Sequence, residues 1–194
     1  MSTLVPAPIA RQPWEMLLPL IALAFFGALV LYSAGGGPWQ PYALPPLLRF
    51  AVFMVVAVVI SRLTRETIML LAYPAFIGVV FLLLVVELVG AVKGGSQRWL
   101  ELGFMRLQPS ELMKPTLCLV LATYYARLPI GMVPIFRALL PPLGFIFLPV
   151  ALVLLQPDLG TSLAIIFSAG VVMFLAGLPL WWFVSAGTAA VAMA

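Results

Sequence analysis

The sequence predicts an all-α, polytopic membrane protein, and three observations support that prediction. Hydrophobic residues make up 64% of the 194 residues, whereas charged residues make up only 8%. The mean hydropathy of +1.20 is far above that of a soluble globular domain. Several apolar runs also reach the roughly 20 residues that a helix needs to cross a bilayer.

These runs predict about seven helices at bilayer length. The first is a retained helix rather than a cleaved signal peptide, because it is long and further spans follow it. Three prolines should bend or delay the fifth helix. We expect a single transmembrane domain over residues 1–194 that is incomplete at its C-terminal end, because the last apolar helix has no polar stop. The expected helices are residues 14–33, 47–61, 68–89, 110–126, 139–155, 159–176 and a last one from residue 180.

Lys and Arg in the connections predict the orientation. Arg11 precedes the first helix, and further basic residues lie in the second–third and fourth–fifth connections. The positive-inside rule therefore places the N-terminus in the cytoplasm. The connection at 93–106 is also basic although it should face outward. Basic residues on the wrong side indicate that this segment uses them for recognition.

The fourth helix opens on a polar corner, Gln108-Pro-Ser-Glu, with Lys114 one turn further on. We expect Ser110 to cap the first turn and Glu111 to lie where the helix dipole favours an anion. Pro115 suggests a broken or re-entrant helix start. The simpler alternative is a capped helix start with a surface ion pair between Glu111 and Lys114.

The sixth helix opens in the same way, on Gln156-Pro-Asp-Leu-Gly-Thr. A plain N-cap explains Asp158 on its own. If both corners face one outer cavity, however, two positive helix ends meet there and suit a phosphate or pyrophosphate group. Trp99 is either an interfacial anchor or a platform for a sugar or headgroup. The predicted substrate-binding residues are Arg98, Trp99, Arg106, Gln108, Glu111, Lys114, Gln156, Asp158 and Thr161.

Composition also restricts the cofactors and partners. The chain has no histidine and one cysteine, Cys118, which excludes a His/Cys metal site and an intrachain disulfide. A divalent cation held by carboxylates and phosphate stays open. With so few charged residues, the net charge of +4 does not indicate a nucleic-acid partner.

Two segments carry a resemblance to a known family, GSQRWLELGFMRLQPSELMK at 95–114 and LLQPDLGTSLAIIFSAGVVMFLAGLP at 154–179. In this order and separated by two helices, they resemble the SEDS family of bacterial membrane proteins, which groups RodA, FtsW and SpoVE, and most closely its RodA branch. The resemblance implies the SEDS fold of about ten helices of bilayer length. This chain would hold the first seven.

The resemblance also implies a function. Family members are peptidoglycan glycosyltransferases of the bacterial inner membrane, which polymerise lipid II and release undecaprenyl pyrophosphate. RodA-like members act in elongation and rod shape with a class B penicillin-binding protein and other membrane proteins of the elongation complex. The expected catalytic aspartate follows the seventh helix, beyond Ala194, so the catalytic residue is unknown here and the fragment alone should be inactive.

Two other classes of function fit the same residues. A flippase or transporter of the lipid-linked precursor would also use a basic cavity with broken helix starts, and its site should open to both membrane faces. A non-catalytic membrane scaffold for cell-wall synthesis or division should instead tolerate the loss of Arg106 and Lys114.

The predicted orientation is testable by labelling single cysteines with a reagent that does not cross the membrane. Positions near Gly36 and Gly95 should react from outside, because their connections face outward. Positions near Thr64 and Ile130 should react only after the membrane is opened. External labelling at Thr64 would overturn the assignment.

Overall fold

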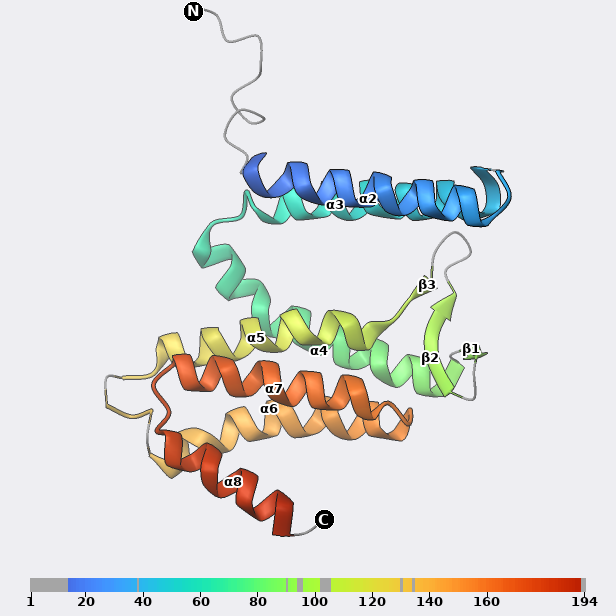
Figure 1. Ribbon diagram of the computed structural model, residues 1–194. Coiled ribbons are helices and arrows are strands. Elements are labelled where there is room, and N and C mark those ends of the chain that lie inside the picture. Colours follow the sequence, from blue (N-terminus) through green and yellow to red (C-terminus); the bar gives the residue numbers. More distant parts are fainter. Residues whose placement is uncertain are drawn as a thin grey trace, which may run out of the picture. The chain divides into compact units, whose positions relative to one another are not determined.

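A computed structural model describes residues 14–37, 39–89, 91–93, 96–101, 106–129, 131–133 and 135–192. Over these residues the chain forms seven α-helices, which confirms the predicted all-α fold (Figure 1). Contacts divide the chain into two compact units, Met1–Leu63 and Thr64–Ala194, and each is described by itself. The single domain over 1–194 stays a prediction.

Unit one contains α2 (Trp14–Ala34), the short π-helical turn η1 (Trp39–Ala43) and α3 (Leu44–Ile60). The turn between α2 and η1 uses Gly36 and Gly37 at φ +80° and +97°, which side chains disfavour. The predicted start of the second helix, residue 47, is wrong by three residues. Two prolines occupy the first turn of α3, where a proline's missing N–H costs nothing.

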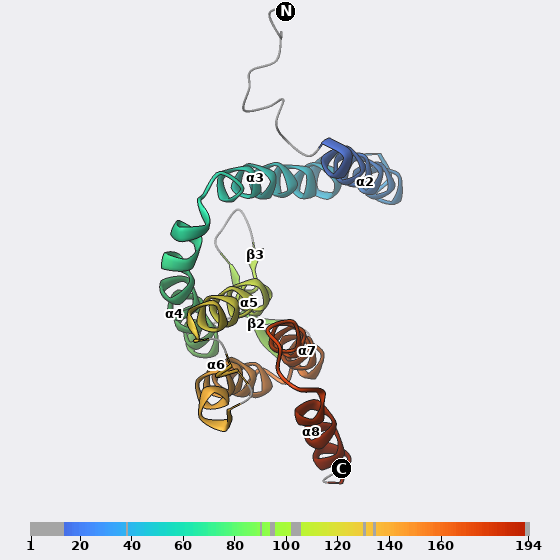
Figure 2. The same cartoon turned by 90° about the vertical axis from the view of Figure 1, so that its left-hand side faces the viewer.

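Unit two contains five helices, and α5 is at their centre. It packs against α4, α6 and α7 (Figures 1 and 2). Met113, Leu117 and Leu121 on α5 are fully buried, as are Leu83 on α4 and Ile165 on α7. The bounds are α4 (Arg65–Val89), α5 (Pro109–Arg127), α6 (Phe136–Leu155), α7 (Leu159–Leu175) and α8 (Leu180–Ala192).

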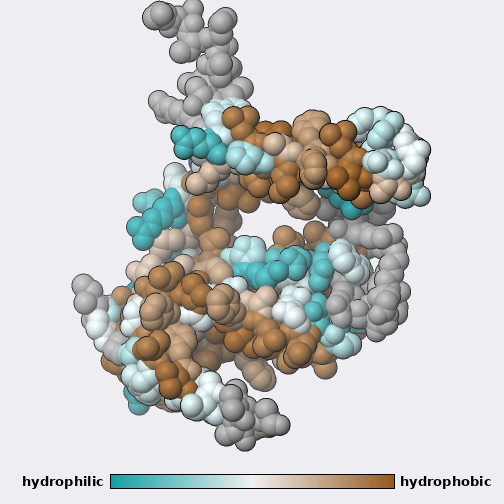
Figure 3. Space-filling model, in the orientation of Figure 1, coloured by the Kyte–Doolittle hydropathy of each residue, from teal (hydrophilic) through white to brown (hydrophobic). Residues whose placement is uncertain are grey.

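Three of the described helices, α2, α4 and α6, are long and apolar enough to cross a membrane, and α3 and α7 are shorter apolar helices. Hydrophobic side chains form most of the visible surface along α2 and over α6 and α7, whereas a hydrophilic strip lies over the N-terminal half of α5 (Figure 3). The apolar helices therefore suit a multi-pass membrane protein.

The connection between α4 and α5 contains three short strands, which the sequence analysis did not anticipate. They are β1 (Ala91–Lys93), β2 (Ser96–Glu101) and β3 (Arg106–Leu107), paired antiparallel in that order. Strand pairing satisfies backbone groups that no helix satisfies here. Glu101 pairs with Arg106 across the last ladder, so β3 leads directly into the start of α5.

Prolines affect the helices less than predicted. The fourth helix is not broken, because α5 continues through Pro115. Pro115 removes one backbone hydrogen bond, but the buried flank of α5 holds the helix together. The fifth helix starts at Phe136 rather than at residue 139, with Pro141, Pro142 and Pro149 all inside it.

The central position of α5 gives a stability prediction. Leu117→Ala should lower the free energy of unfolding by about 2 kcal/mol, because it leaves a cavity among four packed helices. The matched control is Leu163→Ala on α7, whose side chain is 56% exposed. Denaturation in mixed micelles measures both. Equal losses for the two variants would contradict the central role of α5.

Candidate functional site

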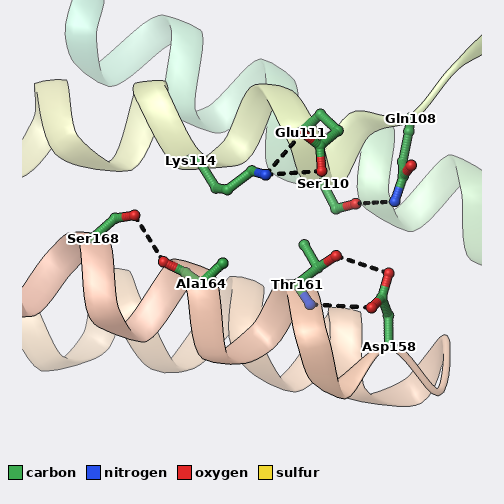
Figure 4. Close-up of polar contacts among 8 residues, drawn as sticks. All are labelled: Gln108, Ser110, Glu111, Lys114, Asp158, Thr161, Ala164 and Ser168. Atoms are coloured by element: carbon green, nitrogen blue, oxygen red, sulfur yellow. Dashed lines mark hydrogen bonds and ion pairs between the residues drawn. The ribbon is translucent and has the colours of Figure 1, made fainter.

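The first polar corner is the start of α5. Gln108 is the N-cap residue, in an extended conformation, and its side chain makes no capping hydrogen bond. Instead its Nε2 donates to Ser110 Oγ at 3.0 Å (Figure 4). The predicted cap by Ser110 is therefore wrong, because this residue lies inside the first turn and is only 2% exposed. Pro109 at the first helical position removes one amide that would need a cap.

Glu111 and Lys114 form an ion pair one turn into α5. The Lys114 ammonium donates to both carboxylate oxygens at 2.8 Å. The Lys114 side chain is 30% exposed and that of Glu111 is 55% exposed. An ammonium group has three N–H donors, so this pairing leaves one donor of Lys114 for a further acceptor. Glu111 thus orients the Lys114 ammonium group and leaves part of the hydrogen-bonding capacity of that ammonium unused.

The second polar corner is the start of α7, where Asp158 is the N-cap, as predicted from its residue type. One carboxylate oxygen accepts from the Thr161 backbone N–H at 3.1 Å, and the other accepts from the Thr161 hydroxyl at 2.9 Å. The Asp158 carbonyl accepts from Ser162 Oγ at 2.8 Å. Asp158 is 8% exposed, so its charge is largely removed from solvent.

Gln156 holds this corner against α4. It ends α6 and is only 3% exposed, and its Nε2 donates to the Leu83 carbonyl at 3.4 Å. This long contact joins residues 73 positions apart in the chain. The burial of Gln156 suits a residue that positions the α6–α7 corner. Its predicted contact with substrate stays a prediction.

The two corners lie at the same end of unit two. Helices α5 and α7 pack side by side and run in the same direction, so their N-termini are neighbours (Figures 1 and 4). Polar side chains from both helices point into the space between them (Figure 4). We name this set the polar seam: Gln108, Ser110, Glu111 and Lys114 on α5, with Asp158, Thr161 and Ser168 on α7.

The polar seam brings Lys114 and two helix N-termini together with the carboxylates of Glu111 and Asp158, and its binding of an anion stays a prediction. Each helix N-terminus carries a partial positive charge, and two of them lie together here beside a lysine. Ser168 was not among the predicted residues, and its hydroxyl donates to the Ala164 carbonyl at 2.7 Å. Its position seven residues after Thr161, two turns along the same helix face, could have revealed it.

The remaining predicted residues lie on the short sheet. Trp99 is half-buried on β2, where its backbone is opposite Ala91 of β1. Arg98 and Arg106 have backbone positions in β2 and β3, but their side chains lie outside the described residues. Their contribution to anion binding therefore stays a prediction, as does that of Trp99.

Among the residues that the structure describes, no group of three or more Cys, Asp or Glu side chains lies close enough together to hold a metal ion. A divalent cation at the polar seam would therefore take most of its oxygen ligands from phosphate or water. That use of a cation stays a prediction.

Comparison with known proteins identifies relatives of this arrangement. Residues 13–194 match the family model of FtsW, RodA and SpoVE, described as a cell cycle protein. The peptidoglycan glycosyltransferase MrdB of Escherichia coli is 36% identical over 173 residues, which are 84% of this chain and 43% of the relative. This chain therefore spans less than half the length of that relative.

Two solved structures are also similar. The crystal structure of the rod shape determining protein RodA of Thermus thermophilus superimposes with a TM-score of 0.76 at 32% identity, over 94% of this chain and 59% of that one. A chain from a peptidoglycan synthase complex that coordinates polymerization and crosslinking gives a TM-score of 0.75 at 31% identity, over 94% and 52%. The chain belongs to the FtsW/RodA/SpoVE family of membrane proteins.

Proposed function

We propose that this chain is the substrate-binding half of a peptidoglycan glycosyltransferase. The observation that carries the proposal is the polar seam, in which two parallel helix N-termini lie side by side and Lys114 is one turn further on (Figure 4). The names of the relatives, MrdB above all, give the reaction class. The proposed substrate is lipid II, a lipid-linked precursor whose pyrophosphate would lie in the polar seam.

The chemistry of glycosyl transfer fits such a site. A sugar hydroxyl gives its proton to a general base and attacks the anomeric carbon of the donor, and the bond from that carbon to the pyrophosphate oxygen breaks. Negative charge grows on the departing pyrophosphate, so fixed donors and a cation there stabilise the transition state. Lys114 and the N-terminal amides of α5 and α7 supply this stabilisation. Because Glu111 is already paired with Lys114, it orients the cation and does not serve as the base.

The proposed orientation places the polar seam on the outer face of the bacterial inner membrane, with the N-terminus in the cytoplasm. In unit two, Arg65 starts α4, Arg127 lies in the last turn of α5, and Arg137 lies in the first turn of α6. All three are at the end of the helices opposite the polar seam. This separation of basic residues from the proposed substrate site supports the orientation.

The proposed partner is a class B penicillin-binding protein that crosslinks the new glycan strand in the elongation complex. The similar chain from a peptidoglycan synthase complex supports this proposal, because that complex joins polymerization to crosslinking.

Lys114→Ala in a protein that contains the whole family domain tests the role of the cation. Polymerisation of lipid II should fall about ten- to a hundred-fold, since one charge-assisted hydrogen bond to phosphate is lost. Glycan products on a gel measure the rate, and the amount of inserted protein should not change. The control Arg137→Ala removes an exposed cation at the other end. Equal activity of the two variants would contradict the proposal.

The substitution Asp158→Asn tests the charge of Asp158 separately from its role as a helix N-cap. Asparagine caps a helix as well as aspartate, so the free energy of unfolding should change by less than about 0.5 kcal/mol. Polymerisation should nevertheless fall about ten-fold, because the substitution removes the charge of a largely buried carboxylate that we expect to orient a cation of the site. Unchanged polymerisation activity would mean that Asp158 acts only as a helix cap. Asp158→Ala is the control for the loss of the cap and should cost about 1 kcal/mol.

A further inference from the structure

A hollow lies between α4 and α5, at the end of unit two opposite the polar seam. It has a volume of about 340 Å³. Arg65 is the first residue of α4, and Arg127 is the last of α5, so the hollow lies beside the basic end of these helices. We name it the α4–α5 groove, and its lining includes Arg65, Ile68, Met69, Ala122, Thr123 and Ala126.

Small side chains on α5 create the groove. Ala122 and Ala126 are one turn apart on the same face, and Thr123 beside them is 2% exposed. Alanine at these positions leaves a depression that larger residues would fill. Apart from Arg65 and Thr123, the residues named as lining it are apolar. Such a surface accepts hydrocarbon.

The mouth of the groove carries a guanidinium without a carboxylate partner. Arg65 is exposed and forms no ion pair among the described residues. Arg127 also lies at this end and contacts the ring of Tyr73 at 5.8 Å instead of a carboxylate. Glu66 follows Arg65 in the chain, but it points to another side of the helix, about 100° around the axis. Arg65 and Arg127 therefore make this end of the groove positively charged, which favours the binding of an anion.

We propose that the α4–α5 groove binds an anionic glycerophospholipid, with an acyl chain along the alanine face and the phosphate on Arg65. A membrane helix pair is surrounded by such lipids, and basic pockets between spanning helices bind their headgroups. The planar guanidinium matches a phosphate with two parallel hydrogen bonds. This site is separate from the polar seam, so it does not depend on the proposed glycosyl transfer. On the proposed topology it takes lipid from the cytoplasmic leaflet.

Native mass spectrometry of the purified chain in detergent micelles tests the proposal, with phosphatidylglycerol and phosphatidylcholine as probes. The chain should retain phosphatidylglycerol in preference to phosphatidylcholine. Arg65→Gln should lower the bound fraction of phosphatidylglycerol about ten-fold, because the charge-assisted contact to phosphate is lost. Arg137→Gln removes another exposed charge, from α6 at the same end, and should leave retention unchanged.

The groove itself is tested by filling it. Ala122→Leu should also lower retention, whereas Ala75→Leu on an exposed position of α4 outside the lining should not. Equal retention by Arg65→Gln and Arg137→Gln would overturn the proposal. So would equal binding of the two lipids, or no effect of Ala122→Leu, or a lipid-bilayer structure with a protein helix in the groove.

Discussion

A charged helix cannot face hydrocarbon, and the architecture of unit two follows from this constraint. Helix α5 carries Glu111 and Lys114 within its first two turns, where contact with lipid would be costly. Burial against α4, α6 and α7 gives its apolar flank a packed core and leaves its polar flank beside α7. The helices packed around it can then be more apolar than α5 is, and α4 and α6 are long and apolar enough to cross a membrane.

The same constraint builds the candidate site. Since α5 and α7 are separated by one antiparallel helix, they run in the same direction and their N-termini lie at one end. Their unsatisfied amides need acceptors there. Asp158 supplies one for α7, whereas Pro109 reduces the need in α5. In the proposed function, the anionic headgroup would contact Lys114, which Glu111 orients, and the N-terminal amides.

Local patterns predicted some details and missed others. The cap by Asp158 was predictable, because a short side chain with an acceptor oxygen, placed before an apolar run, can accept from the free backbone N–H groups of the helix that follows. Serine also favours N-cap positions, yet Gln108, before Pro109, is the N-cap of α5, and its side chain donates to Ser110 instead. Pro115 was expected to break α5. It does not, because surrounding helices hold the flanking turns in place.

The sequence by itself determined the membrane class, the order of the seven helices and the two polar corners, because these follow from apolar run lengths and local capping chemistry. It also carried the family resemblance in the segments around Gln108 and Gln156. Only the tertiary structure decided that Gln156 reaches Leu83 on α4 and that Arg65 lines a groove between α4 and α5. These facts depend on which helix faces pack together, and contacts between distant residues leave no periodic signal in a single chain.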